Sequence, residues 1–257
     1  MIIEFFGLPF SGKTILSSKL KNSYSKRKKI TNYREITFFH LYSLKKINLF
    51  EYEILKKIEY EREFSSDRYK RNIFSKLLKS FLFKILNKEK IQKKIDELFE
   101  LHKKEYLDYL NFLKQKVSDN PNKSNYLNSN RIKHLIIGHS LNKKYNNFIS
   151  INSEGFLQIC LSLLIRIKMD LNDIKKYLSL CPSINYVFVT ISERKEKKKL
   201  IKFLKQRNNK FLFDKTFIKN FFFTIKYIKY LKGRDVNLVY KMNFQEIKNN
   251  MEKNRLV

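Results

Sequence analysis

Several residue types are missing or rare in this chain of 257 residues. Ala and Trp are absent, and the sequence contains only 5 Gly, 3 Pro and 2 Cys. The two cysteines, Cys160 and Cys181, are too few for a disulfide framework or a zinc site, so we expect a reducing, cytoplasmic compartment. Near the N-terminus, Glu4 interrupts the apolar residues and no basic leader precedes them, so we expect no signal peptide.

Long apolar runs are lacking as well. The stretch at residues 211–231 is apolar in bulk, but Asp214 and several lysines interrupt it, so we expect no membrane span. A basic amphipathic helix predicted at residues 74–86 would suit an acidic membrane surface. Its Phe and Leu stripe is also the ordinary pattern of a buried helix face, and we favour that packing over peripheral membrane contact.

Acidic residues are few compared with basic ones. The chain has 24 Asp and Glu against 55 Lys and Arg, a formal net charge of +31. One interpretation is an anionic partner such as a nucleotide, a nucleic acid or an acidic membrane. The other is coding bias on a solvated surface, because AT-rich codons encode the abundant Lys, Asn, Ile, Phe and Tyr. The basic residues are spread along the chain, and no RNA-recognition or zinc-finger pattern is present, so we do not expect nucleic acid as a partner.

The sequence GLPFSGKT, from Gly7 to Thr14, has the spacing of a phosphate-binding loop. It follows an apolar strand predicted at residues 2–6 and precedes a helix predicted to begin at Lys13, the context that this motif requires. Glycine permits close approach of the backbone, Lys13 would reach the β- and γ-phosphates, and the Thr14 hydroxyl would ligate Mg²⁺. The residues predicted to bind the nucleotide are Gly7, Leu8, Pro9, Phe10, Ser11, Gly12, Lys13, Thr14 and Ile15.

Strands and helices are expected to alternate along the chain. We predict strands at residues 2–6, 30–39, 184–192 and 235–243, and a strand running into a turn at 146–155. We predict helices at residues 13–24, 74–86, 91–117, 193–207 and 244–253, and a helix that begins at residue 156. The residues expected to face the core between 91 and 117 are Ile91, Ile95, Leu98, His102, Tyr106, Tyr109 and Leu113. This order predicts an α/β fold with parallel βαβ units, in one domain over residues 1–257 with a helical insertion or lid at about residues 40–145.

The opening MIIEFFGLPFSGKT resembles the start of P-loop small-molecule kinases, including the nucleoside and nucleotide kinases and related bacterial ATP-binding proteins. The resemblance is strong over residues 1–20 and only architectural beyond them. It implies a three-layer P-loop fold with a parallel sheet of five strands, binding of ATP and Mg²⁺, and transfer of the γ-phosphoryl group. Phe10 departs from the resemblance, because such loops often carry Gly at this position.

Two acidic residues are candidates for catalysis. Arg34 and Glu35 resemble the Arg-Glu pair near the substrate of thymidylate kinase-like proteins, where Glu35 would hold the acceptor hydroxyl or accept its proton; an ordinary surface ion pair is the alternative. Glu154 follows an apolar strand, as does the acidic residue that binds Mg²⁺ in P-loop enzymes, so Glu154 and Thr14 are the candidate metal ligands. Ser153 stands where the family usually has Asp, which weakens the expected metal site. The alternative for Glu154 is a turn residue at the end of the strand.

The basic helix predicted at residues 193–207 resembles the lid of small-molecule kinases. Arg207, and less so Arg194, would close on the transferred phosphate, and a solvated basic helix is the alternative. We therefore expect an ATP-dependent phosphotransferase that uses Lys13, Glu35, Glu154 and Arg207 on a small-molecule acceptor that the sequence does not identify. A nucleotide-binding protein with weak or no transfer activity and a nucleic-acid-associated ATPase are the alternatives.

Overall fold

The computed structural model describes most of the chain outside a few connecting segments. The described residues are 1–7, 13–24, 29–64, 86–118, 130–145, 148–167, 169–191, 215–230, 235–240, 245 and 249. The predicted helices at 74–86, 193–207 and 244–253 therefore lie almost entirely outside the described residues, as do Arg194 and Arg207. Leu8, Pro9, Phe10, Ser11 and Gly12 of the predicted phosphate loop also lie outside them.

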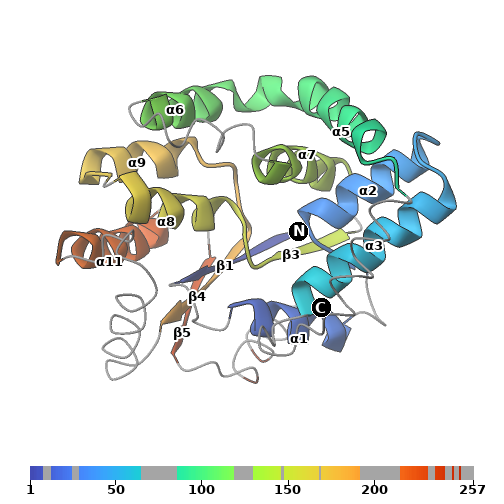
Figure 1. Cartoon of the computed structure of the whole chain (residues 1–257). Coiled ribbons are helices and arrows are strands. Elements are labelled where there is room, and N and C mark those ends of the chain that lie inside the picture. Colours follow the sequence, from blue (N-terminus) through green and yellow to red (C-terminus); the bar gives the residue numbers. More distant parts are fainter. Residues whose placement is uncertain are drawn as a thin grey trace, which may run out of the picture.

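A parallel sheet of five strands forms the centre of the fold (Figure 1). Its strands are β1 (Ile2–Gly7), β2 (Lys29–Thr31), β3 (Phe148–Asn152), β4 (Tyr186–Ile191) and β5 (Asp235–Tyr240). They lie in the order β2-β3-β1-β4-β5, and every neighbouring pair is parallel. Parallel strands covered on both faces read as nearly continuous apolar runs, which is why four of the five strands were predictable. The predicted α/β fold with a parallel sheet is confirmed.

Helices cover both faces of the sheet, and ten helical segments are described. They are α1 (Lys13–Tyr24), α2 (Tyr33–Ser43), α3 (Leu49–Phe64), α5 (Lys88–His102), the 3₁₀ turn η2 (Lys103–Tyr106), α6 (Leu107–Ser118), α7 (Asn130–Lys144), α8 (Phe156–Ile167), α9 (Leu171–Leu180) and α11 (Lys215–Tyr230). On one face of β1, Ile3 and Phe5 pack with Leu16 and Leu20 of α1. On the other face, Ile2 and Phe6 belong to the core formed by α8, α9 and α11 (Figure 1).

The predicted second strand at residues 30–39 is wrong beyond Thr31, because α2 begins at Tyr33. The Asn32 side chain accepts hydrogen bonds from the Arg34 and Glu35 amides at 2.9 and 2.8 Å. The Glu35 carboxylate in turn accepts from the Asn32 amide at 3.1 Å, which completes a capping box. Tyr33, Ile36, Thr37, His40 and Leu41 are buried at helical spacing. These residue types also occur in strands, and the capping box together with the helical spacing of the apolar residues decides for a helix.

The segment between β2 and β3 is helical in its described parts. Six of the seven residues expected to face the core from α5, η2 and α6 are buried, and His102 is partly exposed. The sequence did not single out α7, because ten of its 15 residues are buried, nine of them consecutive, and no polar face marks its period. In Figure 1, α7 lies between α2 and α5, and it packs against both of them.

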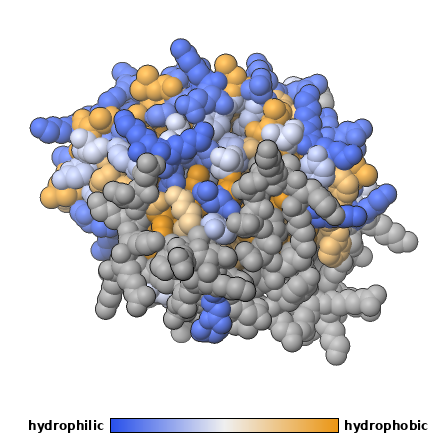
Figure 2. All heavy atoms as spheres, turned by 180° about the vertical axis from the view of Figure 1, so that it is seen from behind, coloured by the Kyte–Doolittle hydropathy of each residue, from blue (hydrophilic) through white to orange (hydrophobic). Residues whose placement is uncertain are grey.

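Figure 2 shows the residue hydropathy on one face of the molecule. On the face drawn in Figure 2, apolar residues form separate small groups among hydrophilic ones. None of the helices described here combines the length and the apolar character needed to cross a membrane.

Candidate functional site

The central strand ends where the predicted phosphate loop begins. β1 ends at Gly7 and α1 begins at Lys13, so both ends of the loop are described although its middle is not. Lys13 Nζ donates a hydrogen bond of 2.8 Å to the Gly7 carbonyl oxygen, which ties the two ends together. The chain passes from β1 to the β2 side of the sheet, and after β3 it crosses to the β4 side. The carboxyl end of β1 is therefore the switch point of the topology, where open parallel sheets bind ligands.

Lys13 is a buried amine at this switch point. The side chain is 8% exposed, and its burial lowers the pKa of Lys13 to about 7. The negative charge of Glu154 opposes this change, and the positive charge of Arg131 adds to it. Near neutral pH a substantial fraction of the amine is uncharged, and an incoming anion would favour the protonated form.

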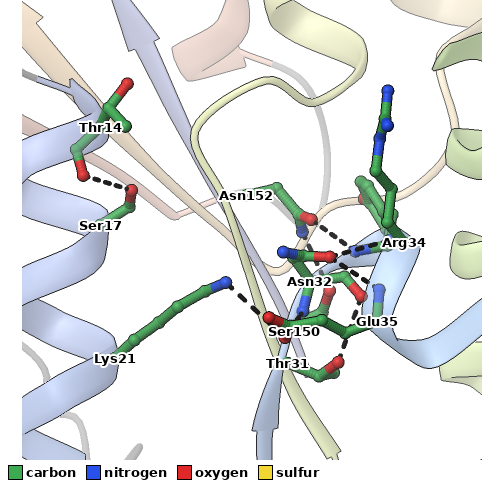
Figure 3. Close-up of polar contacts among 10 residues, drawn as sticks. Thr14, Ser17, Lys21, Thr31, Asn32, Arg34, Glu35, Ser150 and Asn152 are labelled. Carbon is green, nitrogen blue, oxygen red and sulfur yellow. Dashed lines mark hydrogen bonds and ion pairs between the residues drawn. The ribbon is translucent and has the colours of Figure 1, made fainter. Parts of the chain in front are cut away.

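Thr14 and Ile15 complete the described part of the predicted nucleotide site. The Thr14 carbonyl accepts a hydrogen bond from the Ser17 hydroxyl at 3.0 Å within the first turn of α1 (Figure 3). The Thr14 side chain is partly exposed, and Ile15 is exposed. The role of the Thr14 hydroxyl as a metal ligand stays a prediction.

A pocket lies beside this end of the sheet. It has about 350 Å³ of empty space, part of it open to solvent. Its walls come from the start of α2, from α3, from the start of α7 and from the turn after β3. The lining residues are Asn32, Tyr33, Arg34, Glu59, Arg131, His134, Leu135, Asn152, Ser153 and Glu154.

The turn after β3 places Glu154 in this pocket. Glu154 is exposed, and its charge partly offsets the lowering of the Lys13 pKa, so these two predicted site residues interact electrostatically. Ser153, at the position of the expected Asp, is buried. Among the described residues, no three His, Cys, Asp or Glu side chains are grouped so as to hold a metal ion by themselves. The metal-ligand roles of the Thr14 hydroxyl and the Glu154 carboxylate therefore stay predictions, and both would need phosphate and water oxygens to complete the coordination of Mg²⁺.

Glu4 fixes the walls of the pocket from inside the sheet. Its carboxylate is fully buried and accepts hydrogen bonds from the Phe156 and Leu157 amides at 2.9 and 3.0 Å, so it caps the start of α8. The Tyr33 hydroxyl donates a third bond, of 3.0 Å, to Glu4 Oε1, and burial beside this carboxylate raises the pKa of Tyr33. A Cβ atom at Gly155 would lie 2.0–2.3 Å from the carboxylate atoms, so this position accommodates only glycine without movement.

Asn152 joins β3 to the start of α2. Its Oδ1 accepts a hydrogen bond from the Tyr33 amide at 3.0 Å, and its Nδ2 donates to the Ser150 hydroxyl at 3.0 Å (Figure 3). Together with Glu4 it holds Tyr33 at both its amide and its hydroxyl. A carboxylate in an otherwise apolar strand is the sequence signal of this network.

Glu35 is not among the residues that line this pocket, and its predicted acceptor-binding role stays a prediction. Its carboxylate belongs to the capping box of α2 and lies 3.8 Å from Lys21 Nζ, which reaches across from α1 (Figure 3). The carboxylate that lines the pocket near this point is Glu59 of α3, which is 3% exposed and lies 3.9 Å from Arg34. Glu59 and Arg131 come from distant helices, and no motif in the sequence marked them.

Comparison of the chain with protein-family models, with curated proteins and with solved structures finds no match. What this edge of the sheet can do must therefore follow from its own residues. A buried amine can neutralise an anion at the end of β1, and the adjoining pocket can hold a second polar molecule against Glu59, Glu154 and Arg131.

Proposed function

We propose that this protein is an ATP-dependent phosphotransferase of the P-loop kinase type, which transfers the γ-phosphoryl group to a small molecule held in the pocket. The observation that carries the proposal is the position of Lys13. Its amine is buried at the carboxyl end of the central strand, at the start of a helix and beside an open pocket, within a sequence that matches the phosphate-loop motif.

Different described residues have different roles in such a reaction. Lys13 neutralises the β- and γ-phosphates of ATP as charge moves toward the β–γ bridging oxygen. Thr14 and Glu154 would hold Mg²⁺, which supplies further neutralisation of the phosphates. An acceptor hydroxyl oxygen forms a bond to the γ-phosphorus while the bond to the bridging oxygen breaks and ADP leaves. The hydroxyl proton passes to a carboxylate, for which Glu59, in the pocket lining, is a candidate beside Glu35.

One observation favours a second candidate, a nucleotide-binding protein that transfers little phosphate. Ser153 offers a neutral hydroxyl where P-loop kinases usually have a carboxylate, and its side chain is buried. A site with one acidic metal ligand binds Mg²⁺ less tightly, which lowers the rate of transfer more than it lowers nucleotide binding.

Radiolabelled ATP separates these candidates. The protein is incubated with Mg²⁺ and [γ-³²P]ATP in the presence of nucleosides, nucleotides, sugars and sugar phosphates, and labelled products are separated by chromatography. Lys13→Ala should lose both transfer and binding of ATP, whereas Lys19→Ala, on the exposed side of the same helix, should retain both. Binding of ATP without labelled product favours the second candidate, and failure to bind any nucleoside triphosphate refutes both. Stimulation of hydrolysis by polynucleotides would point instead to a nucleic-acid-associated ATPase.

A further inference from the structure

Arg131 is the least satisfied charged group of the pocket. Arg131 lies in the first turn of α7, and the residue is partly exposed. Its Nε and Nη2 atoms are nevertheless shielded from solvent, and no group in the described part of the chain accepts their hydrogen bonds. A guanidinium nitrogen that loses water without gaining an acceptor is costly, because the hydrogen bond to water is not replaced.

The other charged side chains of the pocket each have an oppositely charged neighbour. Arg34 pairs with Glu59 at 3.9 Å, and Glu154 acts on Lys13. Arg131 also acts on Lys13, whose pKa it lowers. The two cations repel each other, and an anion bound near Arg131 would relieve this repulsion.

We infer that the pocket binds an acceptor which carries its own anionic group, a phosphomonoester or a carboxylate, and that Arg131 is the residue that holds this group. The planar guanidinium offers paired donors that match two oxygens of a phosphate or a carboxylate. The acceptor would then lie with its anion at the start of α7 and its reacting oxygen toward Lys13 and Glu154. This inference rests on the proposed function, and it narrows the acceptor from any small molecule to an anionic one.

The test uses inorganic phosphate as the first probe. The nucleotide site is first filled with Mg²⁺ and the non-hydrolysable analogue AMP-PNP, so that phosphate cannot occupy the loop, and the melting temperature is then followed against phosphate concentration. We expect phosphate to raise the melting temperature of the wild type. In Arg131→Gln the apparent dissociation constant of phosphate should rise by roughly 10- to 100-fold, because a charge-assisted pair of hydrogen bonds is lost.

Two further variants control for folding and for charge. Lys143→Gln removes the same charge from the other end of α7, where Lys143 is exposed and 3.7 Å from Glu105, and it should bind phosphate like the wild type. Arg131→Lys keeps the charge but not the paired donors, and it should fall between wild type and Arg131→Gln. Retained AMP-PNP binding and an unchanged circular dichroism spectrum show that Arg131→Gln is folded.

Matched acceptors then distinguish the sources of the anion. Glucose, glucose 6-phosphate and gluconate are compared as acceptors, as are thymidine and thymidine monophosphate, and a preference for the phosphate or for the carboxylate member identifies the group. If AMP-PNP binds but phosphate and the anionic acceptors bind wild type and Arg131→Gln alike, the inference is overturned while the proposed function stands. If AMP-PNP itself does not bind, the proposed function fails first.

Discussion

Replacing Lys13 with methionine should make the protein more stable while it abolishes nucleotide binding. Methionine has nearly the volume of lysine without its charge, and burial of that charge lowers the pKa of Lys13 from 10.5 to about 7. Since a tenfold change in proton affinity is worth about 1.4 kcal/mol, the charged amine costs about 4 to 5 kcal/mol in the folded protein. Loss of the hydrogen bond to Gly7 destabilises the variant by about 1 kcal/mol, so the net increase in the free energy of unfolding is about 3 kcal/mol below pH 7.

The pH dependence of this gain is its most specific feature. Below pH 7 both the folded and the unfolded chain carry the Lys13 proton, and the full cost of the buried charge is present. Between pH 7 and 10.5 the unfolded chain keeps a proton that the folded chain has lost, so the free energy of unfolding of the wild type rises with pH. Lys13→Met lacks this rise, and the two proteins should converge in stability as the pH approaches 10.5.

Thermal unfolding followed by circular dichroism measures the effect. For a chain of this length about 1 kcal/mol shifts the melting temperature by roughly 2–4 °C, so we expect Lys13→Met to melt roughly 6–12 °C above the wild type at pH 6. Lys19→Met, on the exposed side of the same helix, should change the melting temperature little at either pH. A variant that melts below the wild type at pH 6, or a difference that stays constant from pH 6 to 9.5, would show that Lys13 is not a buried charge.

Three other substitutions test the structural residues of the site. Gly155→Ala should lower the free energy of unfolding by about 2 to 4 kcal/mol, because its Cβ atom meets the carboxylate of Glu4. Glu4→Ala should lower the free energy of unfolding less in the Gly155→Ala protein than in the wild type, and a double-mutant cycle measures this difference. Gly138→Ala should also destabilise the protein by about 2 to 4 kcal/mol, since the Cβ atom would lie 2.5 Å from the Tyr33 carbonyl oxygen. Urea unfolding that matches the wild type would contradict this packing of α7 on α2. Glu35→Ala should reduce the free energy of unfolding by about 1 kcal/mol, because the cap of α2 is lost, and should leave KM and kcat within about twofold. A hundredfold loss of kcat would instead support the predicted catalytic role of Glu35.

The sequence predicted the strands and several helices because their burial leaves one clear pattern. β1, β3, β4 and β5 are apolar runs, and α5 and α6 have one apolar face. The start of α2 was mistaken for a strand because its aromatic and β-branched residues suit both structures. Asn32 and Glu35 had the spacing of a capping box, a local signal that decides between the two. α7 gave no such signal, because it is buried on nearly all sides.

The candidate site was predictable only where a motif keeps its residues close in sequence. Lys13 and Glu154 each follow a strand, and parallel strands bring such positions to one edge of the sheet. Glu59 and Arg131 lie within helices whose packing depends on the whole fold, and each is one of many charged residues in a strongly basic chain. Residue type and spacing do not separate them from the solvated charges around them.

The carboxylate of Glu4 has a consequence for how this sequence can change over time. Glu4, Tyr33 and Gly155 lie in contact: the Tyr33 hydroxyl bonds to the Glu4 carboxylate, which fits only because Gly155 has no side chain. A relative that replaced the acid with an apolar residue would have no use for the phenolic hydroxyl and could admit alanine at position 155. We therefore expect these three positions to vary together among descendants of this gene, as a single inherited unit.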